Sequence, residues 1–175
     1  MYLKTDRLII RDFEKKDASG LYELLAHPPV HCFVSQTLNS LDEAEKEVEQ
    51  RVREGNHFAV CLCDTDLMIG ELFAIKKEPD TYNVGWNLNL KYGKQGYAFE
   101  AAKALIQHLF NKDARRIYAY VEDDNIPSQK LCEKLGMRKE GLFMEFISFV
   151  NNQDGTPHYE NTYQYAILKK EWMEP

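Results

Sequence analysis

A short stretch containing glycine and lysine holds the residues best suited to bind an anion. It runs from Leu90 to Ala101 and includes Lys91, Lys94 and Gly96. A strand-like segment precedes it and an apolar helical pattern follows, which predicts a strand, a tight loop and a helix N-terminus. The first amides of a helix lack partners within it and lie at the positive end of its dipole, so they favour a phosphate. The alternative is an ordinary glycine turn between a strand and a helix.

The spacing of the glycines excludes two common nucleotide-binding motifs. A P-loop needs Gly-Lys-Ser or Gly-Lys-Thr after four spacer residues, and none follows here. The three-glycine fingerprint of dinucleotide-binding folds is absent as well. Gly96 still offers close approach of the backbone to a bulky anion, because glycine has no Cβ.

A second stretch, residues 124–137, follows another strand-like segment at residues 116–121. Asn125 precedes Pro127, an arrangement typical of a helix N-cap with proline in the first turn. On the local pattern alone, Asn125 is therefore a helix cap and Ser128 a solvent-exposed serine of the first turn.

Together the two stretches resemble the acetyl-CoA signature of the GCN5-related N-acetyltransferases (GNAT). Within that superfamily they are similar to the RimJ/RimL-type branch, which acetylates the N-termini of ribosomal proteins. The matching residues are Gly96-Tyr97-Ala98-Phe99-Glu100-Ala101, then Asn125 and Ser128, then Glu133-Lys134-Leu135-Gly136-Met137. The resemblance covers nearly the whole chain, from Thr5-Asp6-Arg7-Leu8 to Glu171-Trp172.

The resemblance implies acetyl-CoA as co-substrate, with its pantetheine between two splayed strands at residues 82–90 and 116–121. The family usually has a glycine where Lys94 stands, and Gly93 lies one residue earlier. The loop is therefore either shifted, or Lys94 serves with its amide and side chain. By resemblance, contacts to acetyl-CoA are expected from Asn87, Leu88, Leu90, Lys91, Lys94, Gln95, Gly96, Tyr97, Ala98, Asn125, Ser128 and Lys130.

The reaction that the resemblance implies is attack of a neutral amine on the acetyl thioester. An α-amine, with a pKa of about 7.7–8.0, is partly neutral near pH 7, whereas a lysine at about 10.4 is mostly charged. An α-amine therefore needs only a weak base. In the family a main-chain amide, here near Asn87 or Leu88, stabilises the oxyanion. Ser128 would protonate the departing thiolate.

Carboxylates inside apolar strand segments are the candidates for the base, because burial raises the pKa of a carboxyl group. These catalytic candidates are Glu71, Glu145 and Glu160. The alternative for each is an outward-facing position in an alternating strand. His31, Phe33 and Gln36 lie in a segment that lines the acceptor pocket in the family, and an ordinary loop is the alternative there.

The remaining sequence predicts one α/β (α+β) domain over residues 1–175. By resemblance it is a GNAT fold: one mixed, mostly antiparallel twisted sheet of about seven strands, with a splayed parallel pair and about four flanking helices. The expected strands are residues 3–13, 58–63, 68–76, 82–90, 116–121, 141–151 and 159–168. The expected helices begin at Asp17, Ser40, Ala98 and Pro127.

The composition of the chain limits the kinds of partner that it is expected to bind. The net charge of −6 argues against a generic nucleic-acid binder, and no apolar run reaches membrane-spanning length. The four cysteines have no metal-type pairing, so we expect core thiols, no metal and a cytoplasmic protein.

The sequence thus predicts an acetyl-CoA-dependent N-acetyltransferase for a primary amine, either a protein N-terminus or a small molecule such as a polyamine, an amino acid or an antibiotic. A non-catalytic acyl-CoA-binding sensor is the rival from another class. The chain is expected to be a monomer or a homodimer.

Overall fold

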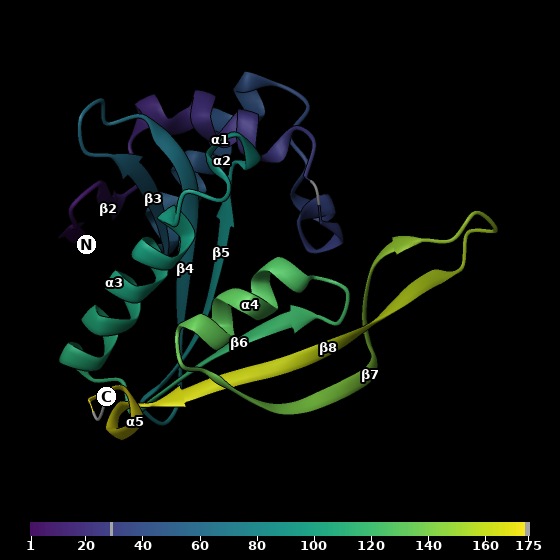
Figure 1. The fold of residues 1–175 in the computed structure, drawn as a ribbon. Coiled ribbons are helices and arrows are strands. Elements are labelled where there is room, and N and C mark those ends of the chain that lie inside the picture. Colours follow the sequence, from purple (N-terminus) through teal and green to yellow (C-terminus); the bar gives the residue numbers. More distant parts are fainter. Residues whose placement is uncertain (29, 174–175) are drawn as a thin grey trace.

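A computed structural model describes residues 1–28 and 30–173, and it contains an eight-stranded sheet (Figure 1). The strand order is β1-β2-β3-β4-β5-β6-β8-β7. Neighbouring strands are antiparallel except β5 and β6, which are parallel. The strands are β1 (Tyr2–Lys4), β2 (Leu8–Asp12), β3 (His57–Leu62), β4 (Met68–Lys77), β5 (Thr81–Leu88), β6 (Arg116–Glu122), β7 (Arg138–Asn151) and β8 (Pro157–Leu168).

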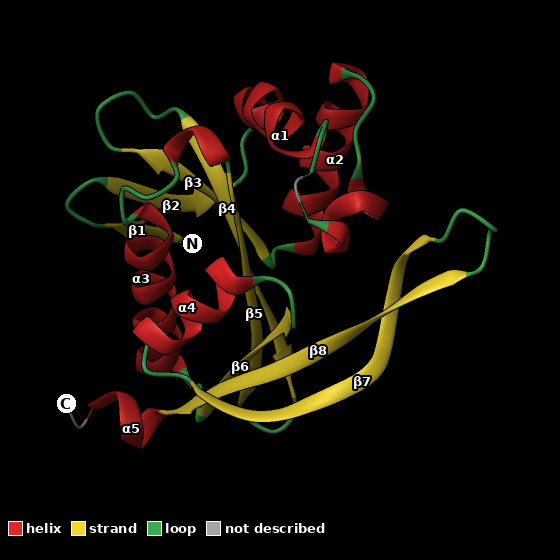
Figure 2. Cartoon of the chain, turned by 45° about the vertical axis from the view of Figure 1, so that its right-hand side comes forward, coloured by secondary structure: helices red, strands yellow, loops and turns green. Residues whose placement is uncertain are grey.

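Helices cover both faces of this sheet (Figure 2). One apolar core joins α3 and α4 to alternate strand residues such as Val60, and a second core joins α1 and α2 to the intervening residues such as Ala59 and Cys61. The period of two along a strand sends neighbours to opposite faces and so builds both cores. The helices are α1 (Ala18–Leu25), α2 (Leu41–Glu54), α3 (Tyr97–Lys112), α4 (Ile126–Lys134) and α5 (Lys169–Met173), with short 3-10 turns η1 (Lys15–Asp17), η2 (His31–Gln36) and η3 (Leu90–Tyr92).

The parallel strands β5 and β6 separate after a short paired region. Their register runs from Thr81 opposite Arg116 to Asn83 opposite Tyr118 and then stops. Beyond these pairs β5 continues to Leu88 without β6 beside it, while β6 stays paired with β8 along its whole length. The splayed parallel pair expected from the sequence is therefore confirmed.

A long hairpin of β7 and β8 extends from the body of the protein (Figure 1). The register of the two strands shifts between Phe143 and Ile147, which marks a bulge, and Glu145 within it has φ +47°. Exposed aromatic side chains gather beside the bulge, where the rings of Phe143 and Phe146 lie 5.1 Å apart between centroids.

The expected fold class is confirmed, with one strand more than the sequence predicted. The prediction of one strand over residues 3–13 is wrong, because the chain reverses direction at Thr5. Its N–H donates to the Leu8 carbonyl, and its hydroxyl accepts from the Leu8 N–H. The two halves then pair with each other as β1 and β2.

The predicted start of α2 is confirmed at its cap. The Ser40 hydroxyl accepts from the Glu43 N–H at 3.2 Å, as a capping serine should. The Glu43 carboxylate accepts from the Asn39 N–H rather than from the Ser40 N–H, so Ser40 and Glu43 do not form the reciprocal pair of hydrogen bonds called a capping box.

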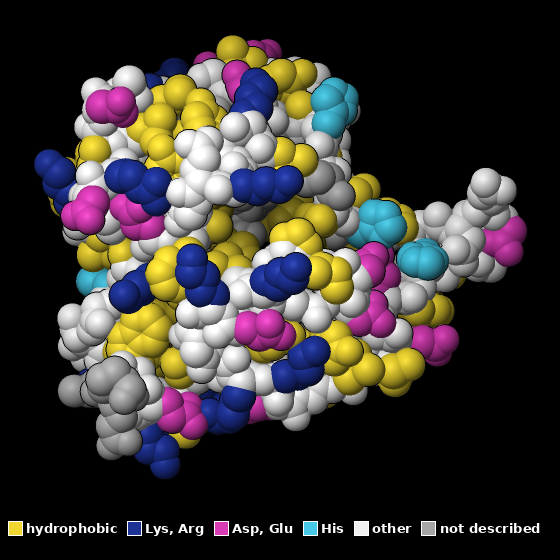
Figure 3. All heavy atoms as spheres, viewed as in Figure 1, with side chains coloured by type: hydrophobic (Ala, Val, Ile, Leu, Met, Phe, Trp, Pro, Cys, Tyr) yellow, Lys and Arg dark blue, Asp and Glu magenta, His cyan; other side chains and the backbone are white. Residues whose placement is uncertain are grey.

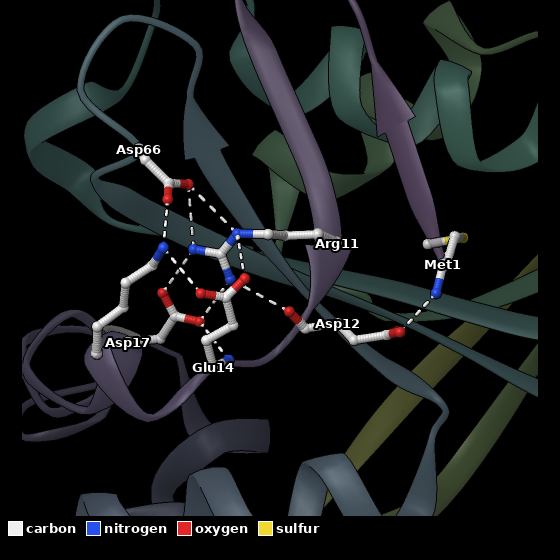
Figure 4. Close-up of polar contacts among 7 residues, drawn as sticks. Met1, Arg11, Asp12, Glu14, Asp17 and Asp66 are labelled. Carbon is white, nitrogen blue, oxygen red and sulfur yellow. Dashed lines mark hydrogen bonds and ion pairs between the residues drawn. The ribbon is translucent and has the colours of Figure 1, made fainter.

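A buried arginine on β2 links the sheet to the start of α1 (Figure 4). The Arg11 guanidinium binds the Asp17 carboxylate in two places, at 2.7 and 2.9 Å, and contacts Asp66 at 3.1 Å. Hydrogen bonding to Asp17 raises the pKa of Arg11, so the side chain stays charged despite its burial. Two-point binding fixes the relative orientation of β2 and α1. In the described ranges no helix is long and apolar enough to cross a membrane.

Candidate functional site

The loop before α3 presents unpaired backbone amides. Gly96 is the N-cap of α3 with φ +84°, and no side chain caps the helix. Glu100 is the first residue of α3 whose N–H binds a carbonyl, that of Gly96. Within the described residues, the amides of Tyr97, Ala98 and Phe99 have no protein acceptor. They can therefore hold an anion at the positive end of the α3 dipole.

The backbone at Lys94 has the conformation expected of the missing glycine. Lys94 has φ +61°, the left-handed conformation that glycine favours, whereas Gly93 has an ordinary φ of −64°. These angles favour the alternative in which the loop is not shifted. Lys94 adopts the backbone that a glycine would have, and a lysine does so at a conformational cost.

Thr5 and Arg7, in the turn between β1 and β2, bind this loop and the start of α3, and we call this set of contacts the brace. The Glu100 carboxylate accepts from the Thr5 hydroxyl at 2.6 Å, from the Arg7 N–H at 3.0 Å and from Arg7 Nε at 2.7 Å. Arg7 Nη1 also donates to the Gln95 carbonyl at 2.9 Å, and its guanidinium lies 4.4 Å from the centre of the Tyr97 ring. Burial alone would raise the pKa of Glu100, but the hydrogen bonds from Thr5 and Arg7 hold it below its ordinary value.

The outer residues of the loop and of α4 are exposed, and the lysines among them form a basic rim. Leu90 is 71% exposed, and Lys130 on α4 is exposed as well. The Lys91 ammonium pairs with Glu23 of α1 at 2.9 Å, so part of its charge is already matched. Figure 3 shows Lys and Arg side chains on two sides of a hollow in this face.

Asn125 and Ser128 meet at the start of α4, next to the separated strands. The Asn125 side chain accepts from the Ser128 N–H at 3.2 Å, so it is a helix cap, as the local pattern predicted. The Ser128 hydroxyl accepts from Trp86 Nε1 at 3.2 Å. Trp86 lies on β5, so this hydrogen bond bridges the separation between β5 and α4. Sequence reasoning missed Trp86.

Strand register distinguishes the two main-chain amides considered on β5. The Asn89 N–H donates to the Ile69 carbonyl at 2.9 Å, so these residues form a hydrogen-bonded pair of the β4–β5 ladder. Such pairs alternate along an antiparallel ladder. Asn87, opposite Glu71, therefore directs its N–H to β4, and Leu88 directs its N–H toward β6. Of the two amides, that of Leu88 therefore faces the separation between the strands.

The Asn87 side chain has a different position. It is 6% exposed, and its Nδ2 has no hydrogen-bond partner among the described residues. Asn87 lies opposite Glu71, which in turn lies opposite Ala59 of the α1/α2 core. A buried, unpaired donor thus faces the side of the sheet away from the α3 loop.

The three expected carboxylates occupy different environments. Glu71 is 2% exposed and pairs with Arg51 of α2 at 2.9 Å. Glu145 is exposed in the β7 bulge, where its N–H donates to Asn161. Glu160 is 9% exposed on β8 and lies 2.5 Å from His31 Nδ1 of η2. The structure does not bring the three together.

A fourth carboxylate, which sequence reasoning missed, lies at the end of β6. Ile117, Ala119 and Val121 belong to the α3/α4 core, so Glu122 points to the opposite face. The Glu122 carboxylate lies near the side chains of Asn125 and Cys32. Burial raises the pKa of Glu122, and the charge of Glu160 raises it further. The alternation of residue types along 116–122 could have shown from the sequence that Glu122 points away from the apolar face of this strand.

These groups can perform acyl transfer between two faces of the sheet. An anion-binding loop and Ser128 lie on the α3/α4 face, and the Leu88 amide points between the strands. Carboxylates and the Asn87 amide lie on the α1/α2 face. An acyl donor bound on the first face and a nucleophile on the second would meet where β5 and β6 separate.

Comparison with known protein families agrees with this geometry. The family described as acetyltransferase (GNAT) domain matches residues 7–138. The uncharacterised N-acetyltransferase YnaD of Bacillus subtilis (strain 168) is 34% identical over 175 residues, which cover 98% of this chain and 99% of YnaD.

Solved structures share the fold. An acetyltransferase of the GNAT family from Bacillus anthracis superimposes with a TM-score of 0.87 at 31% identity, covering 97% of this chain and 99% of that one. A structure of RimL, described as a ribosomal L7/L12 α-N-protein acetyltransferase in complex with coenzyme A, has a TM-score of 0.76 at 19% identity, with 96% and 98% covered. At that identity the likeness to RimL is one of fold.

Proposed function

Because the chain belongs to the GNAT family of acetyltransferases, we propose that it transfers an acetyl group from acetyl-CoA to the α-amine of a protein N-terminus. The observation that carries this proposal is the separation of β5 and β6 beyond Asn83 and Tyr118. The separation leaves main-chain groups of β5 free between an anion-binding loop on one face and acidic side chains on the other.

The residues present fit acetyl-CoA, the co-substrate of the family. The uncapped amides at Tyr97, Ala98 and Phe99 suit its pyrophosphate, and Gly96 has no Cβ to obstruct it. Lys94 and Lys130 would add charge around the phosphates. Acetyl-CoA, when bound, supplies an activated acetyl thioester.

The oxyanion and the leaving thiolate of this reaction can each be stabilised by a hydrogen-bond donor of this chain. The Leu88 N–H stabilises negative charge on the thioester oxygen. The Ser128 hydroxyl donates a hydrogen bond to the departing sulfur. Because Ser128 Oγ accepts a hydrogen bond from Trp86 Nε1, its own proton is free to point toward that sulfur. The acceptor nitrogen forms the new bond to carbon while the carbon–sulfur bond breaks.

We assign removal of the amine proton to Glu122. Glu71 is engaged by Arg51 and Glu160 by His31, and Glu145 is exposed on the hairpin. In the described part of the chain, Glu122 forms no ion pair with a basic residue. It lies at the separated end of β6, where an amine on the α1/α2 face could reach it directly or through one water.

The choice of a peptide acceptor is supported by the unpaired Asn87 amide. A peptide N-terminus has a main-chain carbonyl that can accept a hydrogen bond from Asn87 Nδ2, whereas a simple polyamine has none. An α-amine also loses its proton more readily than a lysine side chain. The RimL likeness in fold is consistent with this choice.

The reaction is tested by thiol release from acetyl-CoA with purified protein. The acceptor panel holds peptides that differ at the first residue, free amino acids, polyamines and an aminoglycoside. Turnover with peptides supports the proposal. Turnover with small amines alone keeps the reaction but overturns the acceptor. Binding of acetyl-CoA with no turnover across the panel would favour the sensor over an enzyme.

The binding loop is tested by Gly96→Val. We expect acetyl-CoA affinity to fall roughly 100-fold in calorimetry, because a Cβ at this αL position strains the loop and blocks the anion. Gly141→Val is the matched control, since a Cβ at Gly141 meets no atom within 4 Å. Unchanged affinity in a folded Gly96→Val protein would refute the loop assignment.

We also place the protein in the cytoplasm. Cys32, Cys61, Cys63 and Cys132 are all free thiols, and free thiols are stable in a reducing compartment.

A further inference from the structure

Three potential metal ligands converge where the hairpin meets the body of the protein. His31 comes from η2, and His158 and Glu160 come from β8. One ligand atom from each lies within 4.8 Å of the other two. The two imidazole rings are nearly perpendicular, at 88°, with centroids 6.1 Å apart. Figure 3 shows histidines beside acidic side chains at the root of the hairpin.

The hydrogen bonding of His158 resembles the outer shell of a metal site. Its Nδ1 lies 3.2 Å from Asn152 Oδ1, so the Nδ1–H donates and Nε2 keeps its lone pair. Asn152 is itself held by hydrogen bonds to Thr156 and to the Pro157 carbonyl. Metal-bound histidines generally donate their second nitrogen to such an acceptor, which fixes the tautomer.

The charge around the cluster favours a cation. Glu160 is 9% exposed, and Glu122 lies close enough for the two carboxylates to influence each other. Among the residues that the structure describes, neither carboxylate forms an ion pair with Lys or Arg, and the ion-pair partner of Glu160 is His31. A buried carboxylate beside a half-buried one, with no fixed positive partner, is costly, and a bound cation would offset that cost.

We propose that His31, His158 and Glu160 bind one divalent transition metal ion of the Zn²⁺ class. Two imidazoles and a carboxylate suit Zn²⁺ rather than Mg²⁺ or Ca²⁺, which prefer oxygen ligands. The ion would lie between His31 and Glu160 once their contact opens from 2.5 Å to about 3.3 Å, the spacing between ligand atoms around tetrahedral zinc. Both histidines are exposed, so water can complete the coordination.

The ion would have a structural effect that is independent of the proposed acetyl transfer. It would fasten the β7–β8 hairpin to η2, two segments separated by more than a hundred residues in the chain. The same contact lies beside Glu122, at the edge of the α1/α2 face. The metal would therefore fix the outer wall of that face.

The test is calorimetric titration of the untagged, chelator-treated protein with Zn²⁺. We expect saturable binding of one ion per chain. His31→Ala and His158→Ala should each lower the affinity roughly 100-fold or more, and Asn152→Ala about 10–100-fold through the outer shell. His27→Ala, a change at an exposed histidine outside the cluster, should leave the affinity unchanged.

Co²⁺ provides a second readout that needs no enzymatic activity. The wild type should give the strong visible absorption of four- or five-coordinate Co²⁺, and His158→Ala should lose it. Circular dichroism checks that each variant is folded. The proposal is overturned by absence of saturable Zn²⁺ binding, by equal binding in the folded His31 and His158 variants, or by the weak spectrum of six-coordinate Co²⁺.

Discussion

At the scale of single residues, the most informative position is Lys94. A lysine there keeps the left-handed backbone, φ +61°, that glycine would adopt without strain. The left-handed conformation costs a residue with a Cβ about 1–2 kcal/mol. The sequence showed that a glycine was missing, but only the backbone could show whether the loop had moved.

Lys94→Gly should therefore stabilise the protein slightly. Relief of the strain outweighs the extra entropy of an unfolded glycine, so we expect a gain of about 0.5–1 kcal/mol in the free energy of unfolding. Urea denaturation measures it as a higher midpoint at constant slope. Gln95→Gly, at a neighbour without a positive φ, should instead lower the midpoint. A lower midpoint for Lys94→Gly would contradict the strain.

Asn87→Ala should separate binding of the acceptor from binding of acetyl-CoA. Because Nδ2 has no partner within the described chain, its loss should cost little stability. A lost hydrogen bond to the peptide, worth about 0.5–1.5 kcal/mol, should raise the peptide KM about 2- to 10-fold. The affinity for acetyl-CoA should not change.

The measurement for Asn87 is steady-state kinetics with a peptide, next to calorimetry with acetyl-CoA. Asn56→Ala is the control, since Asn56 also carries a buried unpaired atom but precedes β3. Equal KM values for wild type and Asn87→Ala would remove Asn87 from the acceptor site.

At the scale of elements, the brace between the β1–β2 turn and α3 connects the chain start to the anion loop. Neither Thr5 nor Arg7 has a pattern that predicts contact with Glu100, because local periodicity contains no information on partners more than ninety positions away. The cap at Asn125 and the end of α2 at Gly55 depend on neighbours in sequence, and these were predictable.

The brace makes stability depend on pH in a defined direction. Thr5 and Arg7 hold the pKa of Glu100 below its ordinary value of 4.5. Its contribution to stability is therefore complete above that pH and is lost as the pH falls through the lower, folded-state pKa. Glu100→Gln should cost about 1–2 kcal/mol at pH 7, and the difference from wild type should shrink below pH 4.5.

Urea unfolding of both proteins at pH 7 and at successively lower pH measures this difference. Glu45→Gln, on the exposed side of α2, should match wild type throughout. A difference for Glu100→Gln that stays constant as the pH falls would exclude the carboxylate charge as its source.

At the scale of the whole molecule, the order of elements and the splayed pair were predictable because each follows from short-range patterns and the family signature. The acidic face was not. Glu122, Glu160 and His31 become neighbours only when η2, β6 and β8 meet across the sheet. The alternation of residues along a strand predicts which face of the sheet Glu122 lies on, but not which side chains lie next to it on that face.

The hydrogen bond between Trp86 and Ser128 has a practical consequence. The chain has two tryptophans, and the other, Trp172, donates to Gln107 and packs against Phe110 away from the separated strands. Trp86 alone has its indole across the opening between β5 and α4. We therefore expect the fluorescence of Trp86 to change when that opening is filled while that of Trp172 stays constant, so that intrinsic fluorescence would report on the opening.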